Sequence, residues 1–248
     1  MHSFSDLARL SSKALIVAGF AAIALPSPSQ ADPITTLTFG ALVNGVDIQN
    51  YYNGGLSSYA PAGDGPNDGL VFSSNATEQR AGFNGTAPNG GTGKFENVPS
   101  GTNGVLYFSF SPSTAGYFSD ATGFTALSFD YSLLGNSSIS GTTVDIWSGI
   151  NATGTLLAQL ALTPSLTPVA CNSSHDEFCT WSTATLQGFG VAESASFTVA
   201  GSSSAQVEYD DMQITGVPEP DSHLLLAGGL LILLGFARRT RRAVAPTN

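Results

Sequence analysis

Short runs of alternating apolar and polar residues fill the middle of this chain, and they limit its fold more than any other feature. The clearest is at residues 127–133, where every second residue is apolar: Leu127, Phe129, Tyr131 and Leu133. Further β-rich runs lie at residues 35–43, 70–72, 104–110, 144–146, 156–162, 194–199 and 205–215. Clusters of Gly, Asn, Ser and Pro separate them, and no helical period competes. We predict an all-β fold, an antiparallel two-sheet, jelly-roll-like sandwich of about eight strands.

The stretch from residue 44 to residue 95 is richer in turn residues than the rest. It contains Asn53-Gly54-Gly55 and the segment from Gly63 to Gly69, which holds three glycines, two aspartates, Pro66 and Asn67. We expect long loops at one end of the sandwich here, where binding sites are common.

The N-terminal residues 1–31 have the order of parts of a secretory signal peptide. A positively charged start precedes an apolar core at residues 14–25, and Ser29-Gln30-Ala31 offers the small residues that a signal peptidase accepts. We expect cleavage between Ala31 and Asp32.

The C-terminal region holds three features in a fixed order. Val217-Pro218-Glu219-Pro220 comes first, and an uncharged apolar stretch follows from Leu224 to Ala237. As a helix this stretch would reach about 21 Å, less than a hydrocarbon core of about 30 Å, but flanking residues extend it. We therefore expect one transmembrane helix over residues 222–237. The basic tail at residues 238–242 should keep the C-terminus in the cytoplasm through Arg238, Arg239, Arg241 and Arg242.

This order of parts resembles the PEP-CTERM sorting signal of Gram-negative bacteria, which has a Pro-Glu-Pro motif, a hydrophobic helix and a basic tail. The resemblance covers residues 216–242 and departs from the family pattern at Asp221, where small hydroxyl residues are common. It implies recognition by an exosortase, a membrane-embedded, transpeptidase-like cysteine enzyme, with cleavage near the motif and delivery to the cell surface or extracellular matrix. The alternative is a simple membrane anchor with a chance Pro-Glu-Pro.

The residues between the two ends, 32–215, suit one ectodomain with a sizeable core. From Asp32 to Asp221 the chain has 17 acidic residues against Arg80 and Lys94, a net charge of −15. Such a surface repels nucleic acids and anionic lipid headgroups, so we predict no nucleic-acid partner. Acidic residues also serve solubility.

Two cysteines, Cys171 and Cys179, enclose a loop of seven residues. In an exported chain this pair predicts a local disulfide that contributes about 2–3 kcal/mol to stability. His175 lies inside the loop and is interpreted as a solvated residue, because the sequence offers neither a zinc-ligand spacing nor a Gly-x-Ser-x-Gly nucleophile motif around it.

The last β-rich run changes its alternation part-way. Val207 and Tyr209 share one parity, whereas Met212 and Ile214 share the other. Because side chains alternate strictly along a strand, the change predicts a β-bulge or bend at Asp210-Asp211.

Residues 209–214 are also similar to the closing strand of many carbohydrate-binding jelly rolls, in which an acidic residue can help to bind a structural calcium ion. Calcium prefers several oxygen ligands at once. This similarity makes Ca²⁺ the one candidate cofactor. Its candidate ligands are Glu208, Asp210 and Asp211. The alternative is that these acids are solvated or hydrogen-bond the bulge.

The sequence gives no complete catalytic set. Asp130, Asp145 and Glu208 could act as a glycosidase pair only if the fold brought two of them together. Five aromatic residues are candidates for exposed positions that stack on sugars, with core positions as the alternative: Tyr51, Tyr52, Tyr59, Trp147 and Trp181. Trp147 shares the face of Asp145, opposite Val144 and Ile146, which predicts a position on the outer sheet surface or in the second layer.

We therefore expect a non-enzymatic exported protein: a β-sandwich ectodomain of structural or adhesive role, held transiently in the inner membrane by one helix. Its expected partners are an exosortase, the membrane and an exopolysaccharide. The alternative is a carbohydrate-active enzyme on a jelly-roll scaffold.

Overall fold

The computed structural model describes residues 34–58, 64–82, 93–108, 115–133, 141–164, 169–172, 177–199 and 206–217. The predicted signal peptide with its cleavage site, the motif from Pro218 onward, the apolar stretch and the arginine tail lie outside these ranges, as do Tyr59 and His175. Within the described ranges there is no helix, and so none long and apolar enough to span a membrane.

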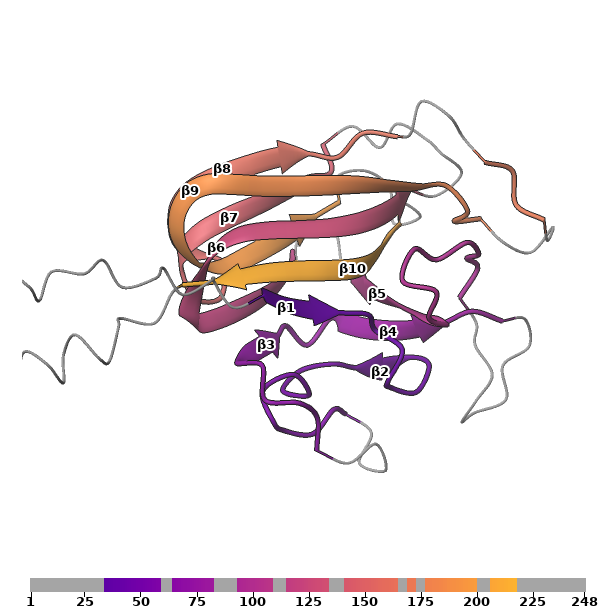
Figure 1. Ribbon diagram of the computed structural model, residues 1–248, viewed down its shortest axis with the longest axis horizontal. Helices are drawn as coiled ribbons and strands as arrows, with labels where there is room; N and C mark the ends of the chain where they lie inside the picture. Colours follow the sequence, from indigo (N-terminus) through magenta and orange to yellow (C-terminus); the bar gives the residue numbers. More distant parts are fainter. Residues whose placement is uncertain are drawn as a thin grey trace, which may run out of the picture. The chain divides into compact units, whose positions relative to one another are not determined.

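The described residues form ten strands, and every pairing between these strands is antiparallel (Figure 1). Their bounds are β1 (Ile34–Leu37), β2 (Val46–Asp47), β3 (Leu70–Phe72), β4 (Ala76–Arg80), β5 (Gly104–Phe108), β6 (Gly116–Leu133), β7 (Thr143–Gly149), β8 (Thr153–Ala161), β9 (Trp181–Thr198) and β10 (Val207–Gly216). The hydrogen-bonded order is β2-β4-β5-β10-β6-β9-β7-β8, with β1 on β10 and β3 on β6. The all-β, antiparallel prediction is confirmed.

The long strands β6 and β9 each take part in two layers, because both bend in the middle (Figure 1). Their register shifts between Ser119 and Phe124, and Gly123 has a φ of 85°, a left-handed value that favours glycine. Beyond the bend, the second half of β6 pairs with β10, whereas its first half pairs with β3. The sheet thus folds over and faces itself.

Phe197 of β9 shows how the two layers meet. Its ring lies 4.9 Å from the rings of Phe108 and Tyr209 and 5.9 Å from that of Phe129, all three on strands of the other layer. All four side chains are fully buried. Burial of such side chains contributes about 1.5–3 kcal/mol each, so this aromatic contact is a main source of the fold's stability.

The glycine- and asparagine-rich stretch is mostly loop, as predicted, but it also holds three short strands. It contains β2, β3 and β4, and it returns its apolar residues to the core. Tyr51 and Tyr52 are only 8% and 6% exposed, and the ring of Tyr52 packs edge-on against Phe39. The prediction that these two tyrosines are exposed for sugar stacking is therefore wrong, because the turns around them fold them inward.

Candidate functional site

The bulge predicted in the last strand is present. The register of β10 against β6 shifts between Asp210 and Gln213, and Asp211 has a φ of 45°. Tyr209 before the bulge and Met212 after it are both fully buried in the main core. The parity change in the sequence therefore serves to keep both halves of β10 packed inward.

Asp210 fastens a loop to this bulge. Its side chain is fully buried, and Oδ2 accepts a hydrogen bond of 3.0 Å from the backbone N–H of Ser100. Burial raises the pKa of Asp210, while the bonds from Ser100 act in the opposite direction. The geometry gives this carboxylate a structural contact, as the bulge-bonding alternative expected.

The predicted calcium ligands do not gather into one group. Among the described residues, the group of three His, Cys, Asp or Glu side chains whose ligand atoms lie within 4.8 Å of one another is Glu96, Cys171 and Cys179. Its two cysteines are joined in a disulfide and offer no thiolate. Calcium takes about 6–8 oxygen ligands, and Glu208, Asp210 and Asp211 do not provide such a cluster.

Of the three carboxylates considered for a glycosidase pair, Asp145 is set apart, whereas Asp130 and Glu208 lie at diagonal positions on two paired strands. Asp145 lies on the outer face of β7 in one layer, whereas Asp130 and Glu208 lie on β6 and β10 of the other. Asp130 accepts a hydrogen bond from Thr183, and Glu208 is only 1% exposed. Glu208 is therefore buried in this layer, beside a hydrogen-bonded Asp130.

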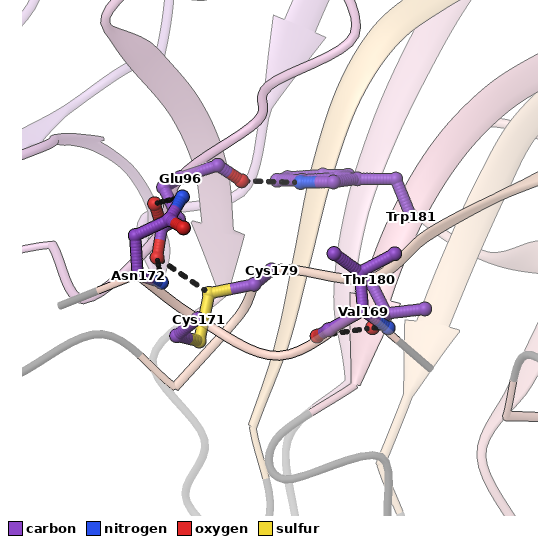
Figure 2. The surroundings of a disulfide bond; sticks show 7 residues. All are labelled: Glu96, Val169, Cys171, Asn172, Cys179, Thr180 and Trp181. Atoms are coloured by element: carbon purple, nitrogen blue, oxygen red, sulfur yellow. Dashed lines mark hydrogen bonds between the residues drawn. A yellow bond between two sulfur atoms is a disulfide. The ribbon is translucent and has the colours of Figure 1, made fainter. Parts of the chain in front are cut away.

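The disulfide joins Cys171 and Cys179, with their Cα atoms 5.4 Å apart, and closes one loop of a corner whose other loop carries Glu96 (Figure 2). Glu96 is the centre of this corner: its carboxylate accepts from the backbone and side-chain amides of Asn172, and its carbonyl accepts from the Trp181 indole at 2.9 Å. Trp181, predicted as an exposed aromatic, therefore packs in a structural role against the small cluster Phe95, Val105 and Phe178.

The outer face of β6, β9, β7 and β8 carries a different set of side chains. One register row runs across these four strands, and we call it the polar row: Tyr117, Ser196, Asp145 and Gln159. In the next row, Trp147 stands beside Ser194 of β9 and Leu156 of β8. The inner neighbours Val144 and Ile146 are fully buried while Trp147 is half-buried, so the outward position inferred from the sequence agrees with the structure.

The indole of Trp147 is held against this face. Its Nε1–H donates a hydrogen bond of 2.9 Å to Ser196 Oγ in the polar row on the neighbouring strand. To reach that atom, the ring must lean across β9 rather than stand upright. Asp145 Oδ1 accepts from Gln159 Nε2 at 2.8 Å, which orders the other end of the row.

The turn between β7 and β8 closes one end of the face. The backbone N–H of Asn151 donates to Ser119 Oγ at 2.9 Å, and that of Ala152 donates to Ser194 Oγ at 3.0 Å. Asn151 and Ala152 both have φ values near 55° to 58°, so buried serines support an unusual backbone. Tyr117 was not identified from the sequence as part of this face. The signal was present: Tyr117 and Phe118 are adjacent, so in a strand one of the two aromatic side chains must point outward.

No protein-family model matches the chain, and no curated protein matches it. Among solved structures, the K2 cleaved adhesin domain of Lys-gingipain aligns with a TM-score of 0.44 and 14% identity over 74% of this chain and 99% of that one. The K1 cleaved adhesin domain of Lys-gingipain from Porphyromonas gingivalis W83 aligns with a TM-score of 0.41 and 14% identity, over 75% of this chain and 99% of that one. The family 11 carbohydrate-binding module of the Clostridium thermocellum cellulase Lic26A-Cel5E aligns with a TM-score of 0.31 and 14% identity, over 77% of this chain and 99% of that one. At TM-scores this low, these similarities say nothing about what the chain binds.

Proposed function

We propose that this chain is an exported cell-surface or extracellular-matrix protein with a non-catalytic body of structural or adhesive role. Its β-sandwich, of jelly-roll type, is flanked by a cleaved signal peptide and by a C-terminal sorting signal. An exosortase recognises Pro218-Glu219-Pro220 and processes the chain after a transient stay in the inner membrane. An exopolysaccharide is the proposed ligand of the body.

The observation that supports this proposal is a disulfide-bonded all-β body in a chain whose two ends have the sequence features of targeting segments. Structural disulfides persist in oxidising compartments outside the cytosol, and the Cys171–Cys179 bond lies in a corner built around it. The acidic charge from Asp32 to Asp221 further disfavours an anionic partner such as nucleic acid.

The sorting part is tested by Glu219→Gln expressed in the producing bacterium, with Glu193→Gln as a matched control on β9. The unmodified protein and the control should reach the surface in a shortened form, measured by mass spectrometry of the surface fraction. Glu219→Gln should stay membrane-bound and longer. Unchanged mass and location of the Glu219→Gln protein would disprove exosortase sorting through this motif.

The binding part is tested on the exported protein with an exopolysaccharide pull-down beside a hydrolysis assay on the same glycans. Retention without release of reducing ends supports a binding body. Turnover would instead identify a carbohydrate-active enzyme.

A further inference from the structure

Trp147 is a large aromatic side chain that the core does not require. The inward-pointing residues of β7, Val144 and Ile146, fill the core, while the indole lies half-exposed on the outer face. Its single donor is satisfied by Ser196, so the ring needs no further polar partner. What it still offers to solvent is part of an apolar ring face.

The polar row adds directional groups close to this ring. Asp145 is opposite Ser196 on one side and opposite Gln159 on the other, and the 2.8 Å bond from Gln159 Nε2 fixes both planar groups. Each of these side chains keeps a second polar position, a carboxylate oxygen or an amide N–H, that can bond a hydroxyl. Half-buried Tyr117 ends the row on β6.

Small side chains form the floor between the aromatic residues. Ser194 and Ser196 of β9 are 0% and 3% exposed, because the Ala152 N–H of the β7–β8 turn bonds the first and the Trp147 indole bonds the second. The β7–β8 turn, tied to Ser119 and Ser194, borders the floor at one end. The face is therefore ordered by bonds within the protein.

We propose that this outer face binds one strand of an uncharged polysaccharide, with Trp147 stacking on a sugar ring and Asp145 with Gln159 bonding its hydroxyls. A sugar ring pairs an apolar C–H face with hydroxyls at its edge, which matches an aromatic face beside planar polar groups. The carboxylate of Asp145 and the net charge of −15 between Asp32 and Asp221 disfavour polyanions, including uronic-acid polymers. This inference rests on the proposed function and specifies the site and ligand class.

The test is affinity electrophoresis of the exported protein through gels that contain mixed-linkage β-glucan, xylan, mannan or dextran, with alginate as an acidic comparison. At least one neutral polymer should retard the protein, and alginate should not. Trp147→Ala should weaken that retardation by about tenfold or more, a change of about 1.4 kcal/mol in binding. Trp147→Phe should recover part of it. Thr185→Ala, on the outer face of the opposite layer, should bind as the unmodified protein does.

A fluorescence readout separates binding from misfolding. The chain has two tryptophans, so Trp181→Phe leaves Trp147 as the sole indole. Its emission should shift to the blue when the retained polymer is added, because the sugar displaces water from the ring. Melting curves then show that Trp147→Ala still folds.

Three results would overturn the proposal. Retention that is equal in folded Trp147→Ala and in the unmodified protein would place glycan binding elsewhere and leave the proposed function standing. Failure of every neutral polymer to bind would refute both this site and the polysaccharide role, but not the sorting of the chain. Loss of self-association in Trp147→Ala without any glycan effect would make the face a contact between two copies.

Discussion

At the scale of single residues, Glu78 of β4 is the clearest case of burial outweighing charge pairing. Its side chain is fully buried, with Oε2 accepting from the Leu42 N–H at 3.0 Å and Oε1 3.7 Å from Arg80 Nε. Both contacts favour the ionised form, yet burial raises the pKa of Glu78 from its ordinary 4.5 to about 8. Near neutral pH this carboxyl is therefore mostly protonated in the folded protein.

This gives a pH dependence with a defined sign. The folded state holds the Glu78 proton up to about pH 8, whereas the unfolded chain loses it near pH 4.5. The stabilisation is full below pH 4.5 and is lost as the pH rises through 8. Burial raises the pKa values of Asp210 and Asp130 in the same direction. Thermal melts should show a more stable protein at about pH 5 than at about pH 9.

Glu78→Gln isolates the contribution of this one group. An uncharged amide can still accept from Leu42 but cannot ionise, so the fall in melting temperature between the two pH values should shrink. Glu193→Gln, a half-exposed position on β9, should leave the slope as it is. Parallel curves for Glu78→Gln and the unmodified protein would show that Glu78 does not titrate as described.

The aromatic contact between the layers gives a second prediction at the residue scale. Phe197→Ala removes a fully buried ring that touches Phe108, Phe129 and Tyr209. Chemical denaturation should show a loss of about 3–5 kcal/mol in the free energy of unfolding. Ile34→Ala, at a side chain 64% exposed, should change it by less than about 0.5 kcal/mol. Similar small losses for both variants would contradict the two-layer core.

At the scale of elements, the disulfide corner joins two segments that lie far apart in the sequence. Lys94 and Glu177 form an ion pair of 2.7 Å, and Phe178 N–H donates to the Lys94 carbonyl at 3.0 Å. These exposed contacts are weak one by one. The disulfide stabilises them indirectly, because it closes the loop that carries Asn172, Glu177 and Phe178 and so holds their contacts with the segment around Lys94.

The double variant Cys171→Ser with Cys179→Ser should therefore act locally. We expect a loss of about 2–3 kcal/mol in stability and faster amide exchange at residues 94–98, while the core strand β10 stays protected. Hydrogen-exchange mass spectrometry measures both. Equally faster amide exchange across the whole sandwich would show that the disulfide does not act locally. Unchanged exchange at residues 94–98 would show that it does not stabilise this corner.

The sequence predicts strands well where one face is apolar and the other polar, as in residues 127–133 of β6. It fails at the start of β6, where Tyr117 and Phe118 occupy opposite faces and break the apolar alternation. It also fails at β4, because most residues of this strand are polar and nothing in the sequence indicates that Glu78 is buried. For the site, the outward position of Trp147 follows from parity alone. Its neighbours do not, because strand order decides which residues share a row.

At the scale of the whole molecule, the proposed targeting segments and the proposed binding body occupy different parts of the chain. Residues 1–31 and 216–242 are interpreted as targeting segments, and the sandwich between them as the part that is exposed outside the cell. The acidic surface, the local disulfide and the outward-facing Trp147 are all compatible with a location outside the cytosol. The exported location is the claim on which the proposed ligand and partners depend.

The most direct test of that claim is the intact mass of the protein recovered from fractions of the producing cell, before and after reduction. The account predicts a surface or matrix form that begins at Asp32, ends near Pro218-Glu219-Pro220 and gains two hydrogens when its disulfide is reduced. A full-length chain recovered intact from the cytosol, with Cys171 and Cys179 as free thiols, would contradict it.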